Sequence, residues 1–259
     1  MVQVEGSEKI PLIVAHRGAS RDAPENTLSA FKLAFERNAD AIEGDFRLTR
    51  DGHIVCIHDR DGHRTLGKRL SVAGSTLAQL RKLDAGSWKG EQWTGERIST
   101  LGEVLDVLPR KCRLYMEVKC GQEILDPLSE VIRSRQSDAG QLVLISYDKE
   151  VIRHFKQRHP HIPAYLVLKF QREHILFGTL KPTLQALIAE LREICADGLD
   201  CQADPRLKPE FAGRLRDAGF PLHVWTVNDT DTAMRFIKDF GVDSVTTDRP
   251  GWLRKQLES

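Results

Sequence analysis

The stretch DAIEGDFRLTRDGHIVCIHD, residues 40–59, decides the fold, because it holds two β-like runs that cannot both belong to a parallel sheet. The first run ends near Leu48 and the second begins near His53. Only the residues from Thr49 to Gly52 separate them, whereas a crossover between parallel strands needs about a dozen residues or more. Asp-Gly between two β-like runs is instead a strong hairpin signal. The second run is therefore predicted to be an antiparallel hairpin strand.

Outside this hairpin, β-like runs alternate with helical patterns from one end of the chain to the other. The other eight runs cover residues 12–17, 40–48, 113–119, 142–147, 164–169, 198–202, 222–227 and 243–248. The helical patterns cover residues 24–38, 124–135, 149–159, 183–194, 208–219, 230–241 and 250–259. Strands separated by helices predict βαβ crossovers and a parallel sheet. We therefore expect an α/β protein of the (β/α)8 TIM-barrel class, with an extra hairpin strand after strand two.

The hairpin also predicts a register. Folding back about Asp51-Gly52 pairs residues whose numbers sum to 103, which places His58 opposite Asp45. A bulge or a longer turn would shift the pairing by one residue and move side chains to the other face.

Composition and charge exclude several classes of protein. The chain has 259 residues, 41% hydrophobic and 29% charged, so it can bury a large core, and we expect one domain over residues 1–259. Its 38 basic and 37 acidic residues give a net charge of +1, which predicts no general attraction to nucleic acid or anionic membranes. There is no signal-like N-terminus and no apolar run near the roughly 18 residues of a membrane span, so we expect a cytoplasmic protein.

The cysteines are predicted to be reduced and free of metal. There are five of them, they are scattered along the chain, and they form no C-x-x-C pair. This pattern disfavours both a disulfide framework and a zinc site.

Reactive side chains gather at the predicted carboxyl ends of the strands, where the active sites of barrels lie. Glu43 and Asp45 are two residues apart on strand two and so share a face, as do Glu117 and Lys119 on strand four. The full set is His16, Arg17, Glu43, Asp45, His58, Glu117, Lys119 and Trp225. If the barrel closes, these groups meet at one mouth, which is costly unless a metal and an anionic ligand are present.

These residue types suit phosphodiester cleavage. Carboxylates with no cysteine nearby favour Mg²⁺ or Ca²⁺ over zinc. Arg17 and Lys119 match a phosphate group, one as a planar fork and the other as a point charge. The imidazoles of His16 and His58 titrate near neutral pH and can serve as general base and general acid.

The motifs of the chain, taken in order, resemble those of the glycerophosphodiester phosphodiesterases. They are His16-Arg17-Gly18, Pro24-Glu25-Asn26-Thr27, Ala39-Asp40-Ala41-Ile42-Glu43-Gly44-Asp45, Thr49-Arg50-Asp51-Gly52, His58-Asp59, Arg64-Thr65, Leu83-Asp84-Ala85-Gly86, Ile98-Ser99-Thr100-Leu101, Glu117-Val118-Lys119, Val224-Trp225-Thr226-Val227-Asn228, Val242-Asp243 and Thr247-Asp248-Arg249-Pro250. Each motif is weak alone, but the ordered combination is highly specific. The resemblance implies a TIM barrel that hydrolyses glycerophosphodiesters to glycerol 3-phosphate and an alcohol.

The resemblance also implies a role for each candidate residue. One divalent cation, Mg²⁺ or Ca²⁺, would be held by Glu43, Asp45 and Glu117. The acid and base pair would be His16 and His58, the phosphate contacts Arg17 and Lys119, and a wall of the glycerol pocket Trp225. A small inserted segment at about residues 60–110, after the second histidine, would shape access to the mouth, whereas residues 169–182 match nothing in the family.

Some of these residues also have plainer interpretations. Glu25 and Asn26 are predicted to begin the first helix, with Asn as its cap, and Thr247-Asp248 to begin the last. The three carboxylates could form an ion-pair network with the two cations and no metal. The remaining histidines are predicted to be surface or packing residues: His53, His63, His154, His159, His161, His174 and His223.

Two other functions compete with the first. One is a related phosphodiesterase that acts on phospholipid head groups, like the phospholipase D toxins or the phosphatidylinositol-specific phospholipases C. The sequence argues against this function, because it has no secretion signal, no disulfide pattern and no apolar loop that could dock on a membrane. The other is a barrel without activity, against which the retained catalytic groups argue, because buried charges without a task destabilise a protein. Direct attack by water and attack by a substrate hydroxyl through a cyclic phosphate both suit these residues.

Overall fold

Eight parallel strands close into a barrel in the computed structural model, which describes residues 10–136, 138–172 and 180–258. The ring is formed by β1 (Leu12–Ala15), β11 (Ser244–Thr247), β10 (Leu222–Trp225), β9 (Gly198–Gln202), β6 (Ala164–Leu168), β5 (Leu142–Ser146), β4 (Arg113–Val118) and β2 (Ala41–Leu48). It closes because β1 pairs with both β2 and β11, and Val14 lies beside Ala41 on one side and Thr246 on the other. The predicted TIM barrel is confirmed.

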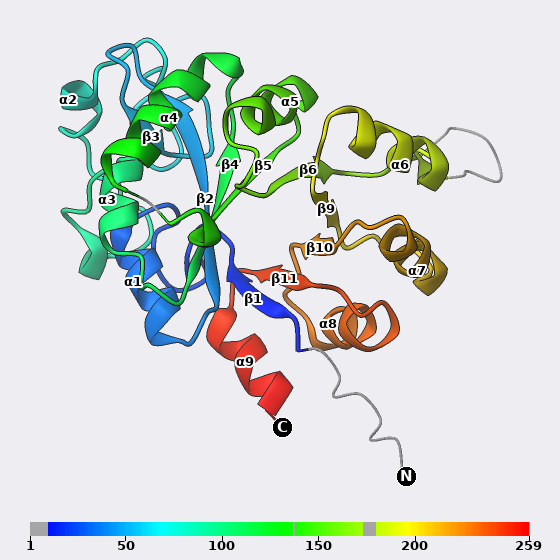
Figure 1. The fold of residues 1–259 in the computed structure, drawn as a ribbon. Helices are drawn as coiled ribbons and strands as arrows, with labels where there is room; N and C mark the ends of the chain where they lie inside the picture. The colour runs from blue at the N-terminus through cyan, green and yellow to red at the C-terminus, as the bar shows by residue number, and fades with distance from the viewer. Residues whose placement is uncertain (1–9, 137, 173–179, 259) are drawn as a thin grey trace.

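Helices surround the strands, as Figure 1 shows. They are α1 (Leu28–Glu36), α4 (Leu125–Ser134), α5 (Lys149–Arg158), α6 (Leu184–Glu193), α7 (Pro209–Asp217), α8 (Thr230–Met234), which runs on into a π-helical turn (Arg235–Asp239), and α9 (Pro250–Glu258). Several begin at a capping side chain that accepts a hydrogen bond from the first turn, as Asp148 does for α5 and Thr183 for α6. Among the described residues, no helix has both the length and the apolar character needed to cross a bilayer.

The strands alternate between two cores. Side chains that face outward pack against the helices, for example Ile42 and Phe46 of β2 against the same cluster as Phe31 of α1. Side chains that face inward form a separate cluster that contains Tyr115 and Tyr165. Because the period is two residues, the positions between the outward ones on β2 are Glu43 and Asp45, which therefore point into the barrel.

The extra hairpin strand is confirmed, but its predicted register is wrong by one residue. β3 (Ile54–Cys56) pairs antiparallel with β2 so that Leu48 lies opposite Ile54. The amide of Ile57, not that of His58, donates to the carbonyl oxygen of Asp45, at 2.8 Å.

The turn explains the shift. The amide of Thr49 donates to His53 O at 2.9 Å, which leaves three loop residues rather than two, and Gly52 adopts a φ of +81°. A turn followed by a left-handed glycine is the usual form of a three-residue hairpin loop.

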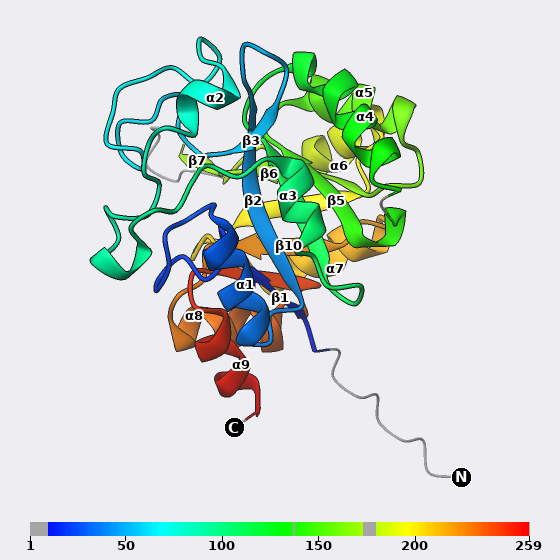
Figure 2. The same ribbon diagram turned by 90° about the vertical axis from the view of Figure 1, so that its left-hand side faces the viewer.

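Most of the predicted insertion at about residues 60–110 lies beside β3, away from the chain termini, whereas its last helix lies against β2 (Figure 2) and contributes Leu101 and Val104 to the main outer core. It contains the short helices α2 (Leu77–Leu80) and α3 (Leu101–Asp106) and a 3-10 turn, Glu91–Trp93. Its apolar side chains, Leu66, Val72, Leu80, Ala85 and Ile98, form a small core with Val55 and Ile57. The insertion is thus anchored beside β3, the strand that precedes His58.

A short antiparallel pair, β7 (Gln171–Arg172) and β8 (Leu180–Lys181), frames the segment at residues 169–182 that matches nothing in the family. Residues 173–179 of that segment, with the predicted surface histidine His174, lie outside the described residues.

Gly18 holds the loop after β1 against α1. It has a φ of +82°, and a Cβ placed there would lie 2.6 Å from the backbone carbon of Ala30. Gly52 has nearly the same φ, but a Cβ there would meet nothing within 4 Å. We therefore expect Gly52→Ala to lower the free energy of unfolding by about 1 kcal/mol, from backbone strain alone. Gly18→Ala should lower it by about 3 kcal/mol or more, because a backbone clash adds to the strain.

Urea denaturation of the two variants and the wild type measures the difference. Equal losses of stability would show that the close approach to Ala30 costs nothing and that Gly18 is needed only for its φ.

Candidate active site

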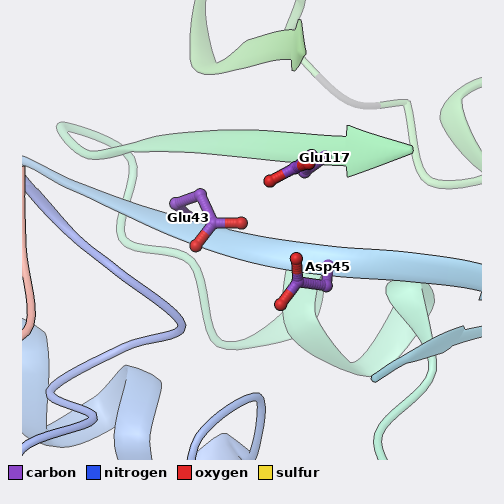
Figure 3. A group of neighbouring side chains, drawn as sticks. All are labelled: Glu43, Asp45 and Glu117. Atoms are coloured by element: carbon purple, nitrogen blue, oxygen red, sulfur yellow. The ribbon is translucent and has the colours of Figure 1, made fainter. Parts of the chain in front are cut away.

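The acidic cluster is built by two neighbouring strands. In the pairing of β2 with β4, Asp45 lies directly beside Glu117, and Glu43 lies one inward position earlier on β2. Figure 3 shows the three side chains directed toward a common space between these strands. Each of them offers an oxygen within 4.8 Å of those of the other two, and all three residues are buried.

One carboxylate oxygen in this cluster lacks a partner among the described residues. Glu43 Oε2 accepts from the amide of Arg17 at 2.8 Å, and Asp45 Oδ2 accepts from Asn26 Nδ2 at 2.8 Å. Asp45 Oδ1 lies 3.2 Å from Lys119 Nζ, whereas Glu43 Oε1 is buried and accepts no hydrogen bond from the described residues. Carboxylate oxygens arranged in this way suit a hard divalent cation such as Mg²⁺ or Ca²⁺.

Electrostatics separate the three carboxyl groups. Burial raises the pKa of Glu43 well above its usual range, and the charges of Asp45 and Glu117 raise it further. Burial and Asp45 likewise raise the pKa of Glu117. Burial acts in the same direction on Asp45, but Arg17 and Lys119 outweigh it and hold the pKa of Asp45 at about 2. Arg17 and Lys119 therefore stabilise the charge of Asp45 most strongly, and Glu43 is the least compensated of the three carboxylates.

Arg17 and Lys119 flank the cluster. Arg17 Nε lies 3.0 Å from Asp45 Oδ2, and Lys119 Nζ lies 2.5 Å from Glu117 Oε1 and 3.2 Å from Asp45 Oδ1. Arg17 is held with a φ of +55°, which is uncommon for a residue with a side chain and is typical of functional sites. Arg17 follows β1 and Lys119 follows β4, so the two positively charged side chains reach the acidic cluster from the strands on either side of β2.

Each of the two predicted catalytic histidines is paired with an aspartate. His16 Nδ1 lies 2.6 Å from Asp248 Oδ1, and His58 Nδ1 lies 2.7 Å from Asp59 Oδ1. An aspartate at Nδ1 orients the ring and leaves Nε2 to exchange a proton. Burial lowers the pKa of His58, against the opposing effects of Asp45 and Asp59, so its neutral form is favoured at pH 7.

Asp248 is itself held in place. It accepts from Ser20 Oγ at 3.1 Å and from Asn228 Nδ2 at 2.6 Å in addition to its contact with His16. Burial acts to raise its pKa, but the hydrogen bond and charge of His16, together with the hydrogen bonds from Asn228 and Ser20, outweigh burial and bring the pKa of Asp248 to about 2. An ionised Asp248 therefore accompanies His16 at neutral pH.

Arg64 of the insertion ties these parts together. Its guanidinium group donates to both oxygens of Glu25, at 2.6 and 2.8 Å, and to Asp59 Oδ2 at 2.8 Å. Glu25 also accepts from Arg17 Nη1 at 2.9 Å. The insertion thus supports both a predicted phosphate contact and the partner of His58.

All the predicted site residues except Asp45 line one cavity of about 160 Å³. Asp45 lies fully buried behind it. Trp225 forms part of the wall and meets the half-exposed ring of Tyr147 edge to face, with 6.2 Å between the ring centres. The barrel therefore brings together the residues that the sequence pattern selected.

Helices begin close to both predicted starts, but the roles predicted for Asn26 and Asp248 are wrong. Thr27, not Asn26, caps α1, since its Oγ1 accepts from the amide of Ala30 at 3.2 Å. Asn26 has a φ of +61° and is instead buried against Asp45. Asp248 supports His16 rather than α9, although Thr247 Oγ1 does accept from the amide of Arg249.

The sequence interpretation therefore missed Asn26, Asp59 and Asp248 as supports of the site. Only Asp59 had a local signal, its place directly after His58. None of the five cysteines forms a disulfide. The predicted packing role of His223 agrees with the structure, in which His223 is buried in ring contact with Tyr165.

Comparisons with known proteins agree with this geometry. The model of the glycerophosphoryl diester phosphodiesterase family matches residues 16–252. A glycerophosphodiester phosphodiesterase of Caldanaerobacter subterraneus subsp. tengcongensis is 34% identical over 243 residues, which cover 92% of this chain and 94% of that protein. One from Bacillus subtilis is 31% identical over 261 residues, covering 94% and 85%.

A solved structure is similar over the same extent. It is an Oleispira antarctica phosphodiesterase in complex with its product sn-glycerol-3-phosphate, with a TM-score of 0.87 and 27% identity. The match covers 96% of this chain and 97% of that one.

Proposed function

The chain belongs to the glycerophosphoryl diester phosphodiesterase family and is a phosphodiesterase, and we propose that it cleaves glycerophosphodiesters to glycerol 3-phosphate and an alcohol with one divalent cation. The observation that carries this proposal is that one cavity is lined by Arg17 and Lys119, by His16 and His58, and by Glu43 and Glu117 of the acidic cluster. Each of the two histidines is held by an aspartate. We further propose that residues 1–259 act as one domain, since the pairing of β1 with β11 joins the two ends of the chain in one ring.

Glu43, Asp45 and Glu117 would hold the cation, and their all-oxygen donor set fits Mg²⁺ or Ca²⁺. When bound, it would polarise a phosphoryl oxygen. The partnerless Glu43 Oε1 and the raised pKa of Glu43 support this role over a metal-free network of ion pairs, because Arg17 and Lys119 leave the carboxylate of Glu43 under-compensated.

Arg17 and Lys119 bind the phosphate group in this proposal. Both line the cavity and both already stand beside carboxylates, so their positive charge is fixed: the pKa of each is raised by the neighbouring acids against the opposing effect of burial. The arginine contributes directional hydrogen bonds and the lysine a point charge.

His16 and His58 move the protons. One imidazole accepts at Nε2 the proton of the attacking group, which is water or a substrate hydroxyl, and the other donates from Nε2 to the leaving alcohol. If a substrate hydroxyl attacks, water then opens the cyclic phosphate with the two histidines in exchanged roles. Both routes consume one water and give glycerol 3-phosphate and the alcohol. The lowered pKa of His58 supports its capacity to accept a proton at neutral pH. Asp59 and Asp248 stabilise the protonated rings.

The glyceryl end of the substrate would occupy the depth of the cavity beside Trp225. The cavity is small, and the similar Oleispira antarctica enzyme was solved with sn-glycerol-3-phosphate bound. The alcohol that leaves would then point toward solvent past His58 and Tyr147.

Metal removal tests the proposal. Treatment with EDTA is expected to lower the release of glycerol 3-phosphate from glycerophosphocholine by about a hundredfold or more, and Mg²⁺ or Ca²⁺ should restore it, because the charge of the acidic cluster requires a cation. Enzymatic assay of glycerol 3-phosphate over a panel of glycerophosphodiesters measures the effect.

Diacyl phosphatidylcholine serves as the comparison substrate. Faster turnover of the diacyl lipid than of glycerophosphocholine would contradict the proposed substrate class, and full activity after exhaustive chelation would contradict the cation.

A further inference from the structure

Asp200 is a cavity residue to which neither the sequence interpretation nor the proposed mechanism assigns a task. It lies on β9 between Leu199 and Cys201, which both face the outer core against the helices. Its own side chain therefore points into the barrel, where it lines the same cavity as Glu117 and Trp225. Only 2% of the residue is exposed.

The carboxyl group of Asp200 lacks the partners that a buried acid normally has. Its Oδ1 is buried without a hydrogen bond from any described residue. Burial raises the pKa of Asp200 well above its usual range, and the charge of Glu117 adds to the effect. A buried polar atom without a partner destabilises the folded protein. Such an atom in a binding cavity is a place for a ligand to supply the missing hydrogen bond.

The ring order places Asp200 across the barrel from the phosphate contacts. β9 is separated from β2 by three strands in either direction around the ring, whereas Arg17 follows β1 and Lys119 follows β4, the two neighbours of β2. A substrate whose phosphate lies between Arg17 and Lys119 would therefore direct its other end toward β9.

The wall beside Asp200 combines apolar and ring side chains. Its neighbours in the sheet are Val167 of β6 and His223 of β10, and the indole of Trp225 donates from Nε1 to the carbonyl oxygen of Asp200 at 3.1 Å. Asp200 thus places a carboxyl group beside the apolar surfaces of Val167 and Trp225. A short carbon chain that carries hydroxyl groups matches this wall.

We propose that the Asp200 carboxyl group accepts a hydrogen bond from a hydroxyl of the glyceryl moiety and so selects a polyol over a plain alkyl group, an inference that rests on the proposed function. A site built to hydrogen-bond a hydroxyl discriminates strongly against the analogue that lacks it, because the polar group of the protein is then left unpaired.

Ligand binding tests this without turnover. Isothermal calorimetry with the Mg²⁺-loaded protein compares glycerol 3-phosphate with n-propyl phosphate, which has the same charge and chain length but no hydroxyls. Asp200→Ala is expected to lower the preference for glycerol 3-phosphate by about tenfold while leaving the affinity for n-propyl phosphate within about twofold. Asp200→Asn, which retains a hydrogen-bonding group, should keep most of the preference.

The matched control is Val167→Ala, which alters the neighbouring wall but removes no polar group. It should leave the preference unchanged. The melting temperature provides a second readout: Asp200→Ala should not lower it, since the substitution removes an unpaired buried carboxyl group.

Two results would overturn the assignment of Asp200. One is an unchanged preference in Asp200→Ala, and the other is an equal loss of affinity for both ligands together with a lowered melting temperature, which indicates a structural role. Absence of glycerophosphodiester turnover by the wild-type protein would instead count against the proposed function, and the binding comparison would still decide the role of Asp200.

Discussion

His16→Ala and His58→Ala are each expected to lower kcat for a glycerophosphodiester by a factor of about 10² to 10⁴, the usual contribution of a general acid or base. Each imidazole lines the cavity, and each is held at Nδ1 by an aspartate, at 2.6 and 2.7 Å. Alanine removes the group that exchanges the proton but leaves the three carboxylates intact. The affinity for the divalent cation should therefore change by less than about twofold, which calorimetry measures beside the steady-state kinetics.

The matched control is His53→Ala, because His53 lies at the hairpin turn with about half of its side chain exposed and lines no part of the cavity. It should leave kcat and cation affinity unchanged. If the His16 or His58 variant lost the cation as fully as a variant of the acidic cluster, the imidazoles would be ligands and their assignment as acid and base would be wrong.

Asp45→Asn is expected to lower the affinity for the divalent cation by about a hundredfold or more and to abolish turnover at ordinary Mg²⁺ concentrations. Asp45 is fully buried within the cluster, and Arg17 and Lys119 lower its pKa against the effect of burial, which favours the ionised form at neutral pH. The amide keeps the shape of the side chain and its contact with Asn26, so the loss isolates the charge. Hard cations depend strongly on the number of charged oxygen ligands.

Titration calorimetry with Mg²⁺ and Ca²⁺ measures this effect, and thermal unfolding verifies that the variant is folded. Glu123→Gln is the control, since this exposed carboxylate is close to Glu117 in the sequence but does not belong to the cluster. Wild-type affinity in Asp45→Asn would contradict the cation site and favour an ion-pair network of the carboxylates with Arg17 and Lys119.

Local rules were sufficient for much of this molecule and failed at identifiable residues. The hairpin was predictable because Asp51-Gly52 joins two β-like runs, but its register depended on whether Gly52 lay within a two-residue loop or ended a three-residue loop. Both turns accept the same residues. The choice between them moved the partner of Asp45 from His58 to Ile57.

The residues that support the site were also beyond the reach of local sequence rules. Asn26 is a good helix cap by type, and so is Thr27, and only the packing of this loop against β2 decides that Thr27 caps and Asn26 binds Asp45. Asp248 lies 232 residues from His16 in the chain, so no local pattern could pair them.

The amino-acid sequence by itself determined the order of strands and helices, the barrel class, the family and the candidate residues for a cation, a phosphate and proton transfer, because periodicity and motif spacing are properties of short segments. The tertiary structure alone decided which oxygens are left without partners, which aspartate holds each imidazole, and that Asp200 faces the cavity across from the phosphate contacts. These features depend on closure of the barrel, which sets distances between side chains that lie far apart in the chain and removes them from water together.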